Sequence, residues 1–181
     1  MTTIEHNPHA DDDVRHDRFT TLYERYHRDV LRFARRRVDS DTAYDVVHDT
    51  FLVVWRRLDD VPEHTRPWIL TIAHHTIGNR LRGQRRLEEA SLRAASAPAA
   101  PQETPEDHAT RMDLARAWDG LDLADREVIA LVAWDSLTAA EAAEVLGCTA
   151  GAFRVRLTRA RARLRVLLGH GTTTPDPGET R

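Results

Sequence analysis

Apolar residues in the first half of the chain recur at the three- and four-residue spacing of amphipathic helices. From residue 19 onward they fall on one helical face: Phe19, Leu22, Tyr26, Val30, Phe33 and Ala34. The same spacing predicts a second helix over about 42–58 and a third that starts at Pro67, a residue suited to a first helical turn. Polar residues break the pattern at 39–42 and at 59–65, where we expect loops. The front of the chain is therefore predicted to be a helical module over residues 18–86.

Three segments lack this periodicity. Residues 1–17 and 169–181 carry no regular apolar spacing and are expected to be disordered. Residues 87–108 are rich in Ala and Pro, which predicts a flexible linker. Beyond it the periodicity resumes over residues 109–168, where Asp122 is expected to cap one of the helices. The predicted fold class is all-α, with two small helical domains joined by the linker.

The second module carries the strongest local signal. Thr138 and Glu141 have the spacing of a capping box, and the short helix that they open ends at Gly147, the residue type that best adopts a left-handed conformation. Thr149 then caps a longer helix over about 150–168. A short helix, a tight turn and a longer helix form the helix-turn-helix pattern of DNA-binding proteins.

The longer helix has two distinct faces at 100° per residue. One is apolar and should pack on the domain: Phe153, Leu157, Ala160, Leu164 and Leu168. The other could enter the major groove and contact bases through Arg154, Val155, Thr158 and Arg159. Further along, three arginines suit phosphate contacts: Arg161, Arg163 and Arg165. The competing interpretation is a solvated face that binds nothing, which the absence of acidic partners along the helix disfavours.

Charge supports this interpretation only when its distribution is considered. The 181 residues hold 26 basic residues, all of them Arg, and 29 acidic ones, for a formal net charge of −3. That total gives no sign of a nucleic-acid-binding protein. Between Val145 and Leu168, however, there are six arginines and no acid. A basic patch acts locally, because salt screens its field beyond about 8–10 Å.

Several classes of protein are disfavoured. The single cysteine, Cys148, excludes an intramolecular disulfide and a multi-cysteine zinc site. The absence of a long apolar run and of a secretory signal predicts a cytoplasmic protein without membrane insertion. His74 and His75 are adjacent and diverge by about 100° on a helix, and the sequence has neither an HExxH motif nor a Gly-rich phosphate loop. We expect no enzymatic activity, no cofactor and no metal site.

Five motifs, in order and over about residues 18–168, resemble the extracytoplasmic-function (group IV) sigma factors of bacterial RNA polymerase. They are Phe19–Tyr26, Ala43–Phe51 with Trp55, Pro67–Ala73 with Asn79–Leu81, Leu123–Val128 and Gly151–Arg161. The resemblance implies a factor that directs promoter-specific initiation. Its first module would bind the clamp helices of the polymerase β′ subunit and the minus-ten element. Its second would bind the minus-thirty-five element and the β flap, and an anti-sigma factor is a possible further partner.

The resemblance also implies roles for particular residues. Polymerase docking would fall to Asp45, His48, Asp49, Leu52 and Arg56, with His48 where the family usually has Gln. The loop over 59–66 would capture a flipped base. The minus-ten element would be held by Arg66, Thr76, Asn79, Arg80 and Arg82. The minus-thirty-five element would be read by Arg154, Val155, Arg156, Thr158 and Arg159, where Val155 departs from the small polar residue common in the family.

A stand-alone helix-turn-helix regulator is the alternative function. Such a protein would dimerise or sense a ligand through its front module and would bind a palindromic site without polymerase. A sigma factor would instead form a tight one-to-one complex with core polymerase and bind promoter DNA weakly by itself. Size exclusion of the purified protein mixed with core enzyme separates the two.

Overall fold

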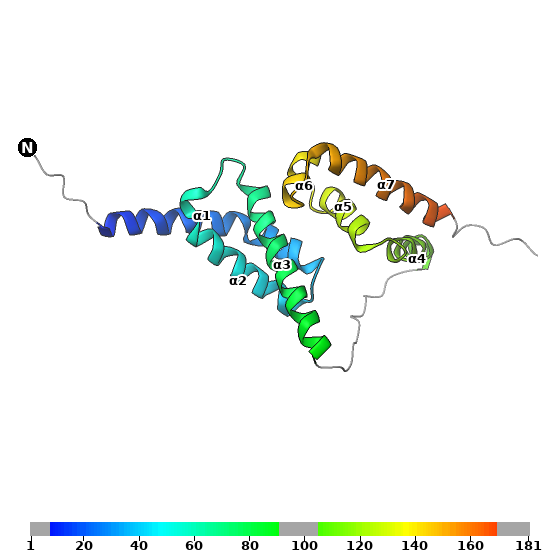
Figure 1. The fold of residues 1–181 in the computed structure, drawn as a ribbon, viewed down its shortest axis with the longest axis horizontal. Helices are drawn as coiled ribbons and strands as arrows, with labels where there is room; N and C mark the ends of the chain where they lie inside the picture. Colours follow the sequence, from blue (N-terminus) through cyan, green and yellow to red (C-terminus); the bar gives the residue numbers. More distant parts are fainter. Residues whose placement is uncertain (1–7, 91–104, 170–181) are drawn as a thin grey trace, which may run out of the picture. The chain divides into compact units, whose positions relative to one another are not determined.

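The computed structural model describes residues 8–90 and 105–169, with side chains over 12–83 and 112–169. Every regular element in these ranges is a helix, which confirms the all-α prediction (Figure 1). The chain divides between Ser96 and Ala97 into two compact units.

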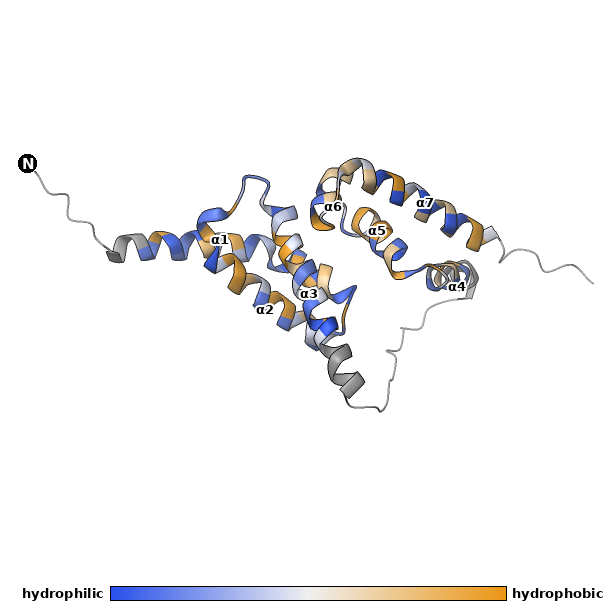
Figure 2. Cartoon of the chain, viewed as in Figure 1, coloured by the Kyte–Doolittle hydropathy of each residue, from blue (hydrophilic) through white to orange (hydrophobic). Residues whose placement is uncertain are grey.

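Unit 1 is a three-helix bundle. Its helices are α1 (Pro8–Arg35), α2 (Ser40–Arg56) and α3 (Thr65–Ala90), with a 3₁₀ turn, η1 (Leu58–Asp60), after α2. Each of the three helices packs against the other two. Figure 2 shows hydrophobic residues alternating with hydrophilic ones along them, as the sequence predicts. The largest fully buried side chains of the bundle are Phe33, Leu58, Ile69, Leu70, Val30, Val46, Val54 and Thr50.

The expected disorder of residues 1–17 is wrong for residues 8–17, because α1 begins at Pro8. Polar contacts, rather than an apolar stripe, hold this extension against the rest of the bundle. Arg15 donates to Asp59 at 2.7 Å, and its guanidinium lies 5.7 Å from the centroid of the Trp55 ring. His16 packs edge-on against the same ring at 6.4 Å.

Helices also enter the expected linker from both sides. α3 continues to Ala90, and α4 begins at Pro105, inside the segment 87–108. Residues 91–104 and the tail from 170 lie outside the described residues.

Unit 2 is built around one long helix. Its elements are α4 (Pro105–Asp119), α5 (Leu123–Ala133), α6 (Ala139–Val145) and α7 (Ala150–Gly169), and α7 packs against the other three. Asp122 caps α5 as predicted, since its carboxylate accepts from the backbone N–H of Asp125 at 2.7 Å. The most buried large side chains of the unit are Phe153, Leu131 and Val145.

The predicted helix-turn-helix is confirmed in its capping contacts. The Thr138 hydroxyl accepts from the Glu141 N–H, and the Glu141 carboxylate accepts from the Thr138 N–H at 2.7 Å. Gly147 has φ +62°. Its N–H donates to the carbonyl of residue 144, and the N–H of residue 148 donates to the carbonyl of residue 143, so α6 ends in a Schellman motif. Thr149 then accepts from the N–H of Ala152 at 3.1 Å and starts α7.

The left-handed backbone at Gly147 is expected to be sensitive to substitution. No atom lies within 4 Å of a Cβ built there, so Gly147→Ala costs backbone strain alone, about 1–2 kcal/mol of unfolding free energy. Denaturant unfolding of the full chain measures this loss. The control is Gly83→Ala inside α3, where a Cβ also meets nothing and the same change should stabilise by roughly 0.5–1 kcal/mol. Equal effects of the two substitutions would contradict the assignment.

Candidate nucleic-acid interface

The α7 helix presents one face to the core of unit 2 and the opposite face to solvent. Phe153, Leu157 and Ala160 are buried, and Leu164 and Leu168 are half-buried, as the helical wheel predicts. All five residues predicted to read the minus-thirty-five element are exposed: Arg154, Val155, Arg156, Thr158 and Arg159. Their backbone is fixed by the packed side of the helix, so these side chains project from a rigid support.

The exposed residues differ in whether their polar groups already form hydrogen bonds within the chain. Arg154 donates from Nε to its own helix at the Ala150 carbonyl, 3.1 Å away. The Thr158 hydroxyl donates to the Arg154 carbonyl at 2.9 Å. Within the part of the chain that the structure describes, Arg156 and Arg159 make no hydrogen bond or ion pair, so their guanidinium groups are the ones available to an external anion.

Arg163 departs from the expected role in phosphate binding. Its guanidinium donates to the Asp125 carboxylate and lies 3.8 Å from that of Asp122, both at the start of α5. Asp125 is only 7% exposed, so its charge requires a partner inside the fold. The hydrogen bond and charge of Asp125 raise the pKa of Arg163. This arginine therefore ties α7 to α5, whereas Arg161 and Arg165 are exposed.

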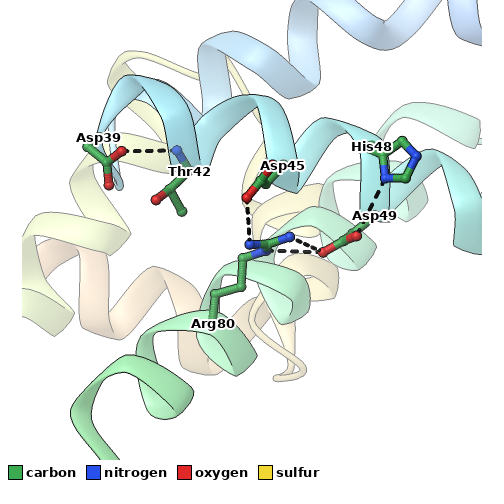
Figure 3. A network of polar contacts seen from close by, with 6 residues as sticks. All are labelled: Asp39, Thr42, Asp45, His48, Asp49 and Arg80. Carbon is green, nitrogen blue, oxygen red and sulfur yellow. Dashed lines mark hydrogen bonds and ion pairs between the residues drawn. The ribbon is translucent and has the colours of Figure 1, made fainter. Parts of the chain in front are cut away.

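In unit 1 the residues predicted to dock on polymerase lie along one side of α2. Asp45, His48, Leu52 and Arg56 are exposed, and Asp49 is half-buried. The His48 imidazole is 3.7 Å from the Asp49 carboxylate (Figure 3). The helix that carries them is capped by Asp39, whose carboxylate accepts from the Thr42 N–H at 3.0 Å.

Arg80 joins this acidic face to α3. Figure 3 shows its guanidinium reaching from α3 to two carboxylates on α2. It donates to Asp49 from Nε at 3.0 Å and from Nη2 at 2.5 Å, and to Asp45 from Nη1 at 3.0 Å. Partial burial alone would lower the pKa of Arg80, but the two carboxylates outweigh it and raise that pKa. The family resemblance implies a DNA contact for Arg80 and a polymerase contact for the two acids, and the fold pairs them with one another.

The other residues assigned to the minus-ten element are spread along α3. Arg66 lies at its start and donates to Asp29 of α1 at 2.9 Å. Thr76 is half-buried, and Asn79 and Arg82 are exposed and joined by a 2.7 Å hydrogen bond. Arg82 and Asn79 therefore face solvent together, whereas Arg66 is held against α1.

An aromatic groove beside the docking face was not singled out by the sequence. It encloses about 350 Å³ between α1 and α2 and is lined by Phe19, Tyr23, Tyr44, Val47, His48, Phe51, Leu52 and Trp55. Tyr44 is 55% exposed and Trp55 37% exposed. Phe19 meets the Phe51 and Trp55 rings edge-on at 6.2 and 5.2 Å. The signal in the sequence is the four-residue spacing of aromatics on both helices, which also fits an ordinary core.

Two family matches cover most of these surfaces. Sigma-70 region 2 matches residues 22–87, which include α2 and nearly all of α3. Sigma-70 region 4 matches residues 111–164, which include the helix-turn-helix.

Individual proteins match over most of their length. The RNA polymerase sigma factor NccH of Alcaligenes xylosoxydans xylosoxydans is 32% identical over 165 residues, covering 83% of this chain and 86% of NccH. The ECF RNA polymerase sigma factor SigK of Mycolicibacterium vanbaalenii is 30% identical, covering 74% and 73%. The solved structure of CnrH in complex with the cytosolic domain of CnrY superposes with a TM-score of 0.57 at 30% identity, covering 84% of this chain and 88% of that one.

The chain belongs to the extracytoplasmic-function sigma factors of RNA polymerase. It is a transcription initiation factor that binds core polymerase and promoter DNA, with region 2 at the minus-ten element and region 4 at the minus-thirty-five element. Membership of this family, which acts by binding, confirms that the protein is not an enzyme. None of the helices in the described ranges is long and apolar enough to cross a membrane.

The pairing of Arg66 with Asp29 predicts a pH-dependent contribution to the stability of unit 1. Burial alone would raise the pKa of Asp29, but hydrogen bonds from Arg66 and Arg32 outweigh it and leave the pKa below its usual 3.8. A carboxyl group whose pKa is lowered by folding stabilises the fold at pH values above its unfolded-state pKa. That stability is lost as the pH falls through its folded-state pKa.

We therefore expect Asp29→Asn to cost on the order of 1 kcal/mol at neutral pH, and the difference from wild type to shrink as the pH drops below about 4. Urea unfolding at a series of pH values measures it. A difference that stays constant down to pH 2 would mean that Asp29 carries no such charge-dependent bond.

Proposed function

We propose that this sigma factor bridges polymerase and promoter through the particular residues that its two units expose. The observation that carries the proposal is the two-sided α7 helix, because its buried side fixes Arg156 and Arg159 outward with no partner in the described residues. Arg pairs bidentately with guanine O6 and N7 and binds phosphate equally well. Arg154, Thr158 and Val155 flank them, so the exposed strip suits the edges of a few successive base pairs.

In unit 1, the docking face of α2 is proposed to bind the β′ clamp helices of polymerase. Asp45 and Asp49 supply negative charge, and Leu52 adds an apolar contact between them and Arg56. His48 can donate or accept one hydrogen bond, as an amide can. A partner with cationic side chains on one helical face would complement this stripe.

The minus-ten element is proposed to lie against the exposed side of α3 and the segment 59–66. The structure forms this predicted loop from part of η1, a short loop and the first two residues of α3. Asn79 and Arg82 are exposed for strand contacts, and Thr76 lies one turn before Arg80. A base flipped from the duplex costs a few kcal/mol of stacking, which a pocket at the loop would have to repay. Arg66 and Arg80 would contribute to DNA only after exchanging their present acidic partners.

Neither unit needs high affinity alone if both are held on one polymerase. Once region 2 is docked, the tether converts the binding of region 4 to the promoter and the β flap into an intramolecular step with a raised effective concentration. The proposed site of action is the cytoplasm, where polymerase and promoter are found.

An anti-sigma factor is proposed as a further partner. CnrH, a relative with the same fold, was solved with the cytosolic domain of a second protein bound. The aromatic groove between α1 and α2 would offer such a protein an apolar surface next to the docking face.

Arg159→Ala is expected to weaken promoter binding by the polymerase complex by about 1–3 kcal/mol, because one bidentate or phosphate contact is lost. The measurement is transcription in vitro from a promoter found by mapping start sites after overexpression. Arg116→Ala is the matched control, an exposed arginine of α4 in the same unit. Loss of polymerase co-elution with Arg159→Ala would contradict the assignment of α7 to DNA.

Asp49→Arg is expected to abolish co-elution with core polymerase in size exclusion, since it reverses the charge at the centre of the docking face. Glu24→Arg makes the same charge change at an exposed site of unit 1 on another helix, α1. Helix content measured by circular dichroism confirms that both variants fold. Unchanged co-elution of the Asp49 variant would remove this residue from the docking face, and failure of the wild type to co-elute would contradict docking altogether.

A further inference from the structure

Arg80 lies where the two proposed surfaces of unit 1 meet. Its guanidinium makes three hydrogen bonds to two carboxylates that come from α2, 31 and 35 residues earlier in the chain. The same residue falls in the segment of α3 assigned to promoter DNA. Arg80 is therefore bound to Asp45 and Asp49, although each of the three is expected to bind an external partner.

These contacts neutralise the charges on which binding depends. A phosphate would gain little from Arg80 while Asp45 and Asp49 are bonded to it, because the two carboxylates repel the phosphate that the guanidinium attracts. Figure 3 shows that the guanidinium points at the α2 acids. In this arrangement α3 offers DNA the exposed Arg82 but not the full charge of Arg80.

The arrangement is also exchangeable. The side chain of Arg80 is 31% exposed, that of Asp49 41% and that of Asp45 63%. Water and ions reach all three groups, and partly exposed ion pairs are weak enough to swap partners. The long arginine side chain can turn to another anion without any movement of the backbone of α3.

We propose that Asp45 and Asp49 hold Arg80 in the free chain, and that cationic side chains of polymerase take over these carboxylates and release Arg80 to a promoter phosphate. The inference rests on the proposed docking of α2. It makes Arg80 a positioning residue before polymerase binds and a DNA contact afterwards. Because coupling between two binding events is reciprocal, promoter DNA that engages Arg80 also strengthens the attachment to polymerase.

The test measures DNA binding by the full chain without polymerase. Asp45→Asn/Asp49→Asn leaves the shape of both side chains and removes the charges that hold Arg80. With a labelled single-stranded DNA of 30 nucleotides, its affinity should rise about 3- to 10-fold near 50 mM salt. The slope of log affinity against log salt should steepen by about 0.7, the value for one added phosphate contact on a single strand.

Two further variants separate release of Arg80 from the gain of positive charge. Glu24→Gln/Asp41→Asn makes the same change in net charge at two exposed acids of unit 1, and its slope should match wild type. Adding Arg80→Gln to the Asp45/Asp49 double variant should return the slope to the wild-type value. An equal slope change in the control, or a gain that survives Arg80→Gln, would overturn the proposal.

The single variant Asp49→Asn covers the case in which the double variant does not fold, since it keeps the Asp45 contact. It should raise DNA affinity and steepen the salt slope by less than the double variant does. Co-elution with polymerase distinguishes the two proposals. Normal co-elution of Asp45→Asn/Asp49→Asn would contradict docking through these acids and the release step with it. Lost co-elution with unchanged DNA binding would contradict only the role of Arg80.

Discussion

The burial of one side of α7 is the constraint on which the rest of unit 2 depends. Phe153, Leu157 and Ala160 reach the core only if the helix takes one rotation about its axis. That rotation turns Arg159 to solvent, because at 100° per residue it lies 100° or more around the helix from all three, and it leaves Arg156 exposed at the edge of the packed side. The caps at Thr138, Gly147 and Thr149 fix where α7 begins, so packing and capping together set the position and direction of its arginines. The orientation of the DNA-binding face therefore follows from the packing of the core.

Internal pairing decides which charges remain available for binding. Arg163, Arg80 and Arg66 were all assigned to nucleic acid from the sequence, and each bonds to a carboxylate of a different helix. Among the acidic partners, Asp125 is buried and Asp29 is half-buried, so their arginines stabilise the fold. A chain of net charge −3 can still bind DNA, because no acid among the described residues pairs with Arg156 or Arg159.

Local patterns in the sequence were sufficient for most of the helices. The apolar spacing predicted α2, α3 and the packed face of α7, and the capping box and Gly147 predicted the helix-turn-helix, because all of these depend on residues within a few positions of one another. Contacts between residues far apart could not be predicted in that way. The Arg80 pairs span 31 and 35 residues, and the aromatic groove needs α1 and α2 side by side. The helical extension at 8–17 was missed for the same reason, since the partners of Arg15, Trp55 and Asp59, lie 40 and 44 residues away.

The helical extension over residues 8–17 matters for any shortened version of the protein. Arg15 bonds to Asp59 at the first position of the loop assigned to the flipped base, and its cation covers the Trp55 ring one turn earlier. A chain shortened to the first apolar stripe at Phe19 would keep every helix of the bundle core and yet lose the ion pair to Asp59 and the cation beside the Trp55 ring.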